Sequence, residues 1–182
     1  LMAQNRSHAV MAQRAEPPDS LDFFPSPMWA TRALLEHVLI GGGWRPDQLK
    51  EMTAHECACG QGHMARPLGE YFREVIASDC HAYGFGAVHD FLMPGKPLKK
   101  VDWVITNPPF RLGEEFILRG LDIARKGVAM LVRTSFIESV GRYEAIFSKK
   151  APIYVAPFVE RVPMFKGRVD PSGSTATSYC WL

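Results

Sequence analysis

The sequence lacks any apolar run near the roughly 18 residues that a membrane-spanning helix requires. Residues 1–20 also lack the compact apolar stretch of a secretory signal peptide. Cysteine is scarce, at four residues in 182, and the spacing of Cys57 and Cys59 does not fit the usual zinc-binding pairs. These absences predict a soluble, cytoplasmic protein with reduced thiols, no membrane contact and no bound metal.

A strong charge of either sign is also missing, because 21 Lys and Arg residues face 19 Asp and Glu residues and leave a net charge of +2. The basic surplus lies in residues 111–182, which hold 11 basic and 7 acidic side chains. Such a bias fits a solvated surface as well as it fits phosphate contacts. Charge alone therefore does not identify a partner.

The length suits one domain with a single core. We interpret residues 1–20, which have no sustained apolar periodicity, as a flexible N-terminal arm, and residues 21–182 as a single domain. The sequence starts at Leu1, not at methionine, and ends in an apolar segment that closes with Trp181 and Leu182. We therefore expect a C-terminus cut short of the natural one.

Short apolar runs alternate with helical stretches beyond residue 26. Pro27 suits the first turn of a helix that Ser26 can cap, and the three glycines at 41–43 stop that helix. This alternation predicts an α/β fold with a largely parallel sheet covered on both faces, whose last strand pairs antiparallel with the strand before it. The predicted strands are residues 51–58, 74–79, 101–106, 127–134, 152–158 and 175–182, and the further predicted helices are residues 64–72, 113–126 and 139–150.

The strongest motif is Asn107-Pro108-Pro109-Phe110, which follows a predicted strand at the edge where open α/β sheets bind ligands. An aromatic amine is a poor nucleophile because its lone pair is delocalised. The Asn107 side-chain oxygen and the Pro108 carbonyl can each accept one of its N–H bonds and favour a tetrahedral nitrogen. The prolines fix the backbone, and Phe110 offers a face for a flipped-out base. A plain β-turn is the alternative interpretation.

The second motif is a Gly-x-Gly turn at Gly60 and Gly62, between a predicted strand and a predicted helix. Bare backbone lets a cofactor approach closely, and Asp79 at the end of the next strand can bind ribose hydroxyls. The spacing of Gly60, Gly62 and Ala65 also satisfies the dinucleotide fingerprint, which indicates a nicotinamide enzyme. The Asn107–Phe110 motif decides against that interpretation, because a nicotinamide enzyme does not need it.

Together these segments resemble the AdoMet-dependent amino methyltransferases, especially the adenine-N6 DNA methyltransferases, over roughly residues 22–182. The catalytic motif of that family is Asn/Asp-Pro-Pro-aromatic, and its first motif is acidic-x-x-x-Gly-x-Gly. The resemblance implies a Rossmann-like methyltransferase fold, S-adenosyl-L-methionine as the cofactor, and DNA methylation at adenine N6. It makes Asn107, Pro108, Pro109 and Phe110 the catalytic loop of a single catalytic domain.

The same resemblance implies a set of cofactor contacts. The segment from Phe24 to Pro27 would touch the methionine moiety, Asp79 the ribose, and Asp90 with Phe91 the adenine. Cys57 departs from the family, which often has proline there. The implied cofactor-binding residues are Phe24, Pro25, Ser26, Pro27, Glu56, Cys59, Gly60, Gly62, Asp79, Asp90, Phe91 and Asn107.

A substrate-binding segment is predicted before the last strand, where Arg161, Lys166 and Arg168 lie with Phe165. Basic residues with an interleaved aromatic can hold a nucleotide by phosphate contact and stacking. A solvated loop fits the same composition, but the position of this loop in the family favours contact with the target base. We therefore group these four residues with Phe110 as substrate-binding. Arg133 lies at the end of the predicted strand at residues 127–134, where the sheet is expected to bind ligands.

Other acceptors and another class of function stay open. Enzymes that methylate RNA bases or protein glutamine use the same motif, usually with tyrosine last, so Phe110 favours DNA. The chain has no room for a target-recognition domain. It could accordingly depend on a partner subunit for target recognition, or itself be a non-catalytic AdoMet- or nucleic-acid-binding partner. The sequence predicts no particular oligomeric state.

Overall fold

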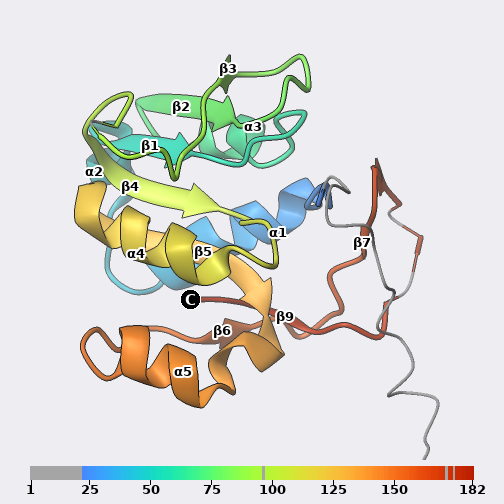
Figure 1. Cartoon of the computed structure of the whole chain (residues 1–182). Coiled ribbons are helices and arrows are strands. Elements are labelled where there is room, and N and C mark those ends of the chain that lie inside the picture. Colours follow the sequence, from blue (N-terminus) through green and yellow to red (C-terminus); the bar gives the residue numbers. More distant parts are fainter. Residues whose placement is uncertain (1–21, 96, 171, 174) are drawn as a thin grey trace, which may run out of the picture.

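The fold is built around a seven-stranded sheet with the strand order β3-β2-β1-β4-β5-β9-β6 (Figure 1). The strands from β3 to β5 pair in parallel, whereas β9 is antiparallel to both of its neighbours, as predicted for the last strand. A separate hairpin is formed by β7 and β8. The strands are β1 Thr53–Glu56, β2 Glu74–Asp79, β3 Ala87–Val88, β4 Val101–Thr106, β5 Ala124–Arg133, β6 Ala156–Pro157, β7 Met164–Phe165, β8 Arg168–Val169 and β9 Tyr179–Trp181.

This computed structural model describes residues 22–95, 97–170, 172–173 and 175–182, so the predicted arm at residues 1–20 lies outside the described residues. The first helix begins as α-helix and continues directly as π-helix until the turn at Gly41. The helices are α1 Met28–Ala33, η2 Leu34–Ile40, α2 Pro46–Lys50, α3 Ala65–Leu68, α4 Gly113–Ile123, η3 Thr134–Ile137, α5 Val140–Arg142 and η4 Tyr143–Phe147.

Side chains of the central strands alternate between two hydrophobic clusters. Trp103 and Ile105 of β4 pack with residues of α1, η2, α2 and α3. Val104, between them, packs with α4 and with Ile146 of η4. The same alternation continues along β5 and β9, as the two-residue period of a strand requires. Helices therefore cover both faces of the sheet, as predicted (Figure 1).

The order of the strands creates one point where a ligand site is expected. The chain runs from β1 outward to β2 and β3, and then returns to the other side of β1 to form β4 and β5. Open α/β sheets bind ligands in the crevice at the carboxyl ends of the strands where this order reverses. Glu56 closes β1 and Asn107 follows β4, so both residues lie at the reversal.

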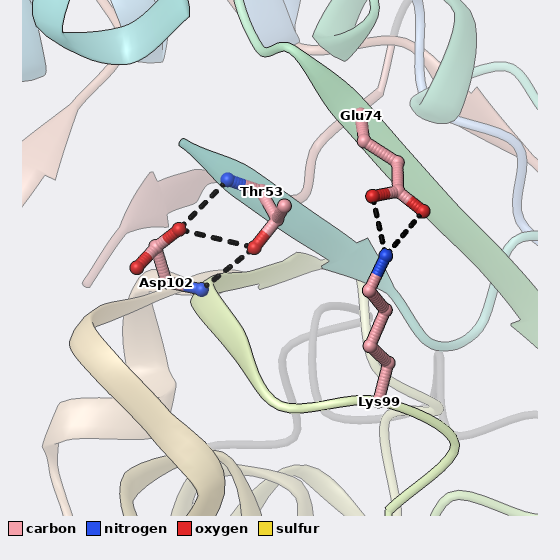
Figure 2. A network of polar contacts seen from close by, with 4 residues as sticks. All are labelled: Thr53, Glu74, Lys99 and Asp102. Carbon is pink, nitrogen blue, oxygen red and sulfur yellow. Dashed lines mark hydrogen bonds and ion pairs between the residues drawn. The ribbon is translucent and has the colours of Figure 1, made fainter. Parts of the chain in front are cut away.

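Strands β1, β2 and β4 are joined by polar contacts at their amino ends, opposite the ends where the ligand site is expected (Figure 2). One Asp102 carboxylate oxygen accepts hydrogen bonds from the Thr53 N–H at 2.9 Å and the Thr53 hydroxyl at 3.0 Å. Lys99 pairs with the Glu74 carboxylate at 2.6 Å. Burial raises the pKa of Asp102, but hydrogen bonds from Arg125 and Thr53 outweigh burial and lower it. The amino ends of β1, β2 and β4 are thus held together away from the candidate site.

Four helical predictions need correction. Ser26 does not cap the first helix, because Pro27 takes the N-cap position without a side-chain hydrogen bond and the Ser26 hydroxyl contacts Asn107 instead. The predicted helix at 64–72 is reduced to α3, since Gly69 begins a series of tight turns. The predicted helix at 113–126 ends at Ile123, because the chain is drawn into β5, which pairs with β4. The helix at 139–150 forms only as α5 and η4.

Strand boundaries also differ from the prediction. The strand expected at 152–158 is reduced to β6, at the edge of the sheet, where Pro157 lacks an N–H donor and can be tolerated. The strand expected at 175–182 is reduced to β9, and the strand at 51–58 to β1. The two-residue strands β3, β7 and β8 were not predicted, because two residues cannot display a period.

Candidate active site

A cavity of about 240 Å³ lies at the carboxyl ends of β1, β2 and β4. All residues predicted to bind the cofactor line this cavity except Pro27 and Gly62. Pro27 is the N-cap of α1, and Gly62 packs beneath the Phe85 ring, which an added Cβ would meet at 2.6 Å. The fold therefore gathers five separate segments of the predicted site around one space.

Asn107 is held by its side-chain nitrogen, which donates to the Phe24 carbonyl at 3.0 Å and to the Ser26 hydroxyl at 3.2 Å. It also approaches the Met164 sulfur at 3.6 Å. A backbone carbonyl can only accept, so the amide NH₂ must face Phe24 and the amide oxygen must face the other way. That oxygen is buried and has no hydrogen-bond partner in the described part of the chain. A ligand donor would relieve a cost of about 1–3 kcal/mol.

The predicted catalytic loop separates two cavities. Asn107 and Pro109 line the first cavity, whereas Pro108 and Phe110 line a second one of about 160 Å³. Successive residues of an extended segment point to opposite sides, which explains the alternation. The arrangement can present a donor molecule and an acceptor molecule to the same four residues from two sides.

Phe110 is packed more closely than the prediction of an open stacking face requires. Its N–H donates to the Asp22 carboxylate at 2.6 Å. Its half-buried ring lies 5.0 Å from the Phe24 ring and 6.1 Å from the Tyr179 ring. The Arg133 guanidinium carbon lies 4.3 Å from the Phe110 ring centroid and covers one face. A base that stacks on that face must displace the guanidinium.

Glu56 is a buried carboxyl at the end of β1. One oxygen accepts hydrogen bonds from the Thr106 hydroxyl at 2.5 Å and from the Ala58 N–H at 3.2 Å. The other oxygen is buried without a partner among the described residues. Burial raises the pKa of Glu56 to about 8, in spite of these hydrogen bonds. A cationic ligand in the cavity would stabilise the ionised form.

The glycine turn after β1 is shaped by Asp79 and Phe23. Gly60 adopts φ +48°, and an added Cβ would meet the Phe23 ring at 2.5 Å. The Asp79 carboxylate accepts from the Gly60 N–H at 2.9 Å and from the His81 N–H at 3.0 Å. A carboxylate has about four acceptor sites, so two remain for ligand hydroxyls.

The remaining predicted cofactor residues differ in exposure. The exposed Asp90 carboxylate accepts from the Leu92 N–H at 2.9 Å. Phe91 is only 4% exposed, and its ring lies 5.1 Å from the Phe116 ring in the core. Cys59 is buried, and burial raises the pKa of its thiol to about 12. Asp90 is thus free to make polar contacts, whereas Phe91 and Cys59 form apolar walls.

The predicted substrate-binding segment is only partly brought to the site. Phe165 and Arg168 lie in the β7–β8 hairpin, with the Arg168 guanidinium carbon 5.4 Å from the Phe165 ring centroid, and Lys166 lies in its turn. Arg161 is turned away and donates to the Ala176 carbonyl at 2.9 Å. None of these four lines either cavity beside the catalytic loop. The hairpin reaches the site through Met164, beside Asn107.

Several residues at the site were not predicted. Asp22 fixes the Phe110 N–H, and Met164 contacts the Asn107 amide. His63 lines the first cavity with a buried ring nitrogen that has no partner among the described residues. Arg142 lines the second cavity. Only tertiary packing unites them with the catalytic loop, so no local sequence signal could have found them.

Among the residues that the structure describes, no three His, Cys, Asp or Glu side chains are grouped so as to hold a metal ion. Within the same residues, no helix is long and apolar enough to cross a membrane. The four cysteines are free thiols, and only Cys80 is exposed. Its neighbour Asp79 and burial both raise the pKa of the Cys80 thiol.

Searches of protein families and of curated proteins find no match to the chain. Solved structures do resemble it. A protein of Pyrococcus horikoshii assigned as an RNA methyltransferase has a TM-score of 0.60 and 16% identity, over 95% of this chain and 93% of that one. A Thermoplasma acidophilum protein has a TM-score of 0.55 and 15% identity, over 84% and 85% of the two chains.

A third similar structure is the magnesium protoporphyrin IX methyltransferase of Synechocystis with bound SAM. Its TM-score is 0.51 at 12% identity, over 85% of this chain and 77% of that one. At such identities the likeness concerns the fold. The mostly parallel sheet with one antiparallel strand agrees with it. The chain has the Rossmann-like methyltransferase fold.

Proposed function

We propose that this chain is an AdoMet-dependent methyltransferase that transfers a methyl group to an exocyclic amine, adenine N6 of a nucleic acid. The observation that carries the proposal is the buried, unpartnered Asn107 side-chain oxygen at the carboxyl end of β4. An amine N–H is the donor that this oxygen lacks. A hydrogen bond there would orient the nitrogen lone pair toward a methyl donor in the first cavity.

The residues around the first cavity fit S-adenosyl-L-methionine. Gly60 has no Cβ, so the Phe23 ring can lie against the turn and line the cavity, and Asp79 retains acceptor sites for ribose hydroxyls. The unpaired oxygen of Glu56 suits a ligand that carries positive charge. When bound, the cofactor supplies a methyl group that its sulfonium already activates, so no metal and no covalent enzyme intermediate are required.

The chain's own residues would bind and orient the acceptor. The Asn107 oxygen and the Pro108 carbonyl would accept the two amine N–H bonds, while the prolines keep both acceptors in place. Held by these acceptors, the nitrogen would turn its lone pair toward the methyl group that the cofactor supplies, and the amine proton would be released to solvent. Phe110 would stack the base once the Arg133 guanidinium has moved from its ring.

Two nucleic acids are candidates for the acceptor. Phenylalanine as the last residue of the motif favours DNA, by resemblance to the adenine-N6 DNA methyltransferases. The similar Pyrococcus structure is assigned as an RNA methyltransferase, which makes RNA the second candidate. A partner subunit for target recognition would suit either acceptor.

The direct test is incubation of the purified protein with methyl-labelled AdoMet and separate pools of unmethylated DNA, RNA and protein. The proposal expects label in nucleic acid and N6-methylated adenine after digestion and mass spectrometry. Label in protein alone would replace it with glutamine methylation. AdoMet binding without transfer to any pool would favour the non-catalytic partner, and NAD binding without AdoMet binding would overturn the cofactor assignment.

A further inference from the structure

The second cavity beside the catalytic loop is basic as well as aromatic. It lies against β5, η3 and α5, and its lining includes Pro108, Phe110, Arg133, Ser135, Phe136 and Arg142. Arg133 is exposed and Arg142 is half-buried. Neither forms an ion pair with a carboxylate in the part of the chain that the structure describes. Two uncompensated positive charges thus face the space on the acceptor side of the loop.

Each guanidinium of this cavity is oriented by an aromatic ring. The Arg133 guanidinium carbon lies 4.3 Å from the Phe110 ring centroid, and that of Arg142 lies 4.2 Å from the Phe136 ring centroid. One Arg142 nitrogen also donates to the Phe136 carbonyl at 2.7 Å. The planar fork of a guanidinium has five donors, so most remain available to a ligand.

Phosphate is the group that matches this arrangement. Arginine binds phosphate oxygens through two parallel hydrogen bonds, and the Arg142 guanidinium, which is held on the Phe136 ring, loses less entropy when it does so. In nucleic-acid complexes such contacts fix the register of the strand, while other groups act on the base. The loop itself connects the second cavity to Asn107, because Phe110, which lines that cavity, follows Asn107 by three residues in the sequence.

We propose that Arg133 and Arg142 bind the backbone phosphates of the strand that carries the methylated base, next to the nucleotide that reaches Asn107. This inference rests on the proposed function, because it requires a nucleic acid as the acceptor. DNA and RNA share the phosphodiester group, so the cavity itself accepts either. The predicted segment with Arg161 and Arg168 is then not the main anchor, since it lines neither cavity.

The test measures binding of fluorescent single-stranded oligonucleotides of about 12 nucleotides, in DNA and RNA arms, by anisotropy at several salt concentrations. Arg133→Gln and Arg142→Gln should each weaken binding about tenfold, the scale of one charge-assisted hydrogen bond. Each should also reduce the slope of log K against log salt by about 0.7, the value for one phosphate contact on a single strand. Arg133→Lys should keep the slope.

Lys100→Gln is the matched control. This exposed lysine directly precedes β4, at the amino end of the strand, and its substitution removes the same single positive charge. AdoMet affinity should be unchanged in all variants, which also confirms that they fold. Arginine variants with the affinity and salt slope of Lys100→Gln would overturn the inference while methylation by the wild type upholds the proposed function. A wild type that binds AdoMet but neither oligonucleotide would overturn both.

Discussion

The Asn107 side chain is the residue on which the proposed chemistry depends. Asn107→Ala removes the buried acceptor but leaves the cofactor cavity otherwise lined as before. We expect AdoMet affinity to change little and turnover to fall at least ~100-fold, the scale for loss of one preorganised polar group in a transition state. Calorimetry and single-turnover methylation measure the two quantities separately.

Ser26→Ala serves as the comparison for Asn107→Ala. It removes one acceptor that holds the amide nitrogen, yet it keeps the Phe24 carbonyl and the amide oxygen. Its turnover should therefore fall much less. Wild-type turnover in Asn107→Ala would disprove the mechanism even if cofactor and fold are correct.

Glu56 makes cofactor binding depend on pH. Its carboxyl is protonated below a pKa of about 8 in the empty cavity because burial disfavours the charge. A cationic ligand lowers that pKa, so binding releases a proton and affinity rises with pH until about 8. Glu56→Gln should remove this part of the dependence. Calorimetry in two buffers of different ionisation enthalpy gives the number of protons released on cofactor binding. Equal numbers for the wild type and Glu56→Gln would contradict the assignment of this proton to Glu56.

At the scale of elements, the glycine turn between β1 and α3 has the least tolerance for change. Gly60→Ala must keep φ at +48° and push its Cβ into the Phe23 ring at 2.5 Å. We expect a loss of more than about 1 kcal/mol in stability and a clear loss of AdoMet affinity. Denaturant titration and calorimetry measure these effects.

Gly43→Ala separates backbone strain from crowding. Gly43 has φ +111°, but nothing lies within 4 Å of an added Cβ, and the residue is remote from the cavity. It should lose stability through strain and keep wild-type AdoMet affinity. Equal affinities in Gly60→Ala and Gly43→Ala would show that the Gly60 turn does not contact the cofactor.

Some elements were predictable and others were not, for physical reasons. The buried strand β4 and the loop after it are contiguous in sequence, so their apolar period and proline signals could be read directly. The end of α4 could not, because Ala124 leaves a helical pattern in order to pair with Val101. The hairpin strands β7 and β8 are two residues long, so they show no periodicity in the sequence. Their position beside the site is evident only from the contact between Met164 and Asn107.

For the whole molecule, the strand reversal at β1 and β4 converts two sequence motifs into one site. The glycine turn and the Asn107 loop are far apart in the chain, and parallel pairing of their strands brings them to the same edge. Resemblance to a family supplied the proposed cofactor residues. It could not supply Arg133 over Phe110 or Asp22 on the Phe110 N–H, because distant segments create these contacts during packing.

Cofactor choice is tested on the whole molecule by thermal unfolding. AdoMet at about 100 times its dissociation constant should add about 2.7 kcal/mol of stability, which for a domain of this size raises Tm by roughly 5–10 °C. NAD at the same concentration should not raise it.

Asp90→Ala should reduce the AdoMet shift, because this exposed carboxylate lines the cavity. Asp122→Ala is the control, since its ion pair with Arg119 lies away from the cavity. A rise in Tm with NAD and none with AdoMet would contradict the cofactor assignment, because a ligand stabilises only the folded protein that binds it.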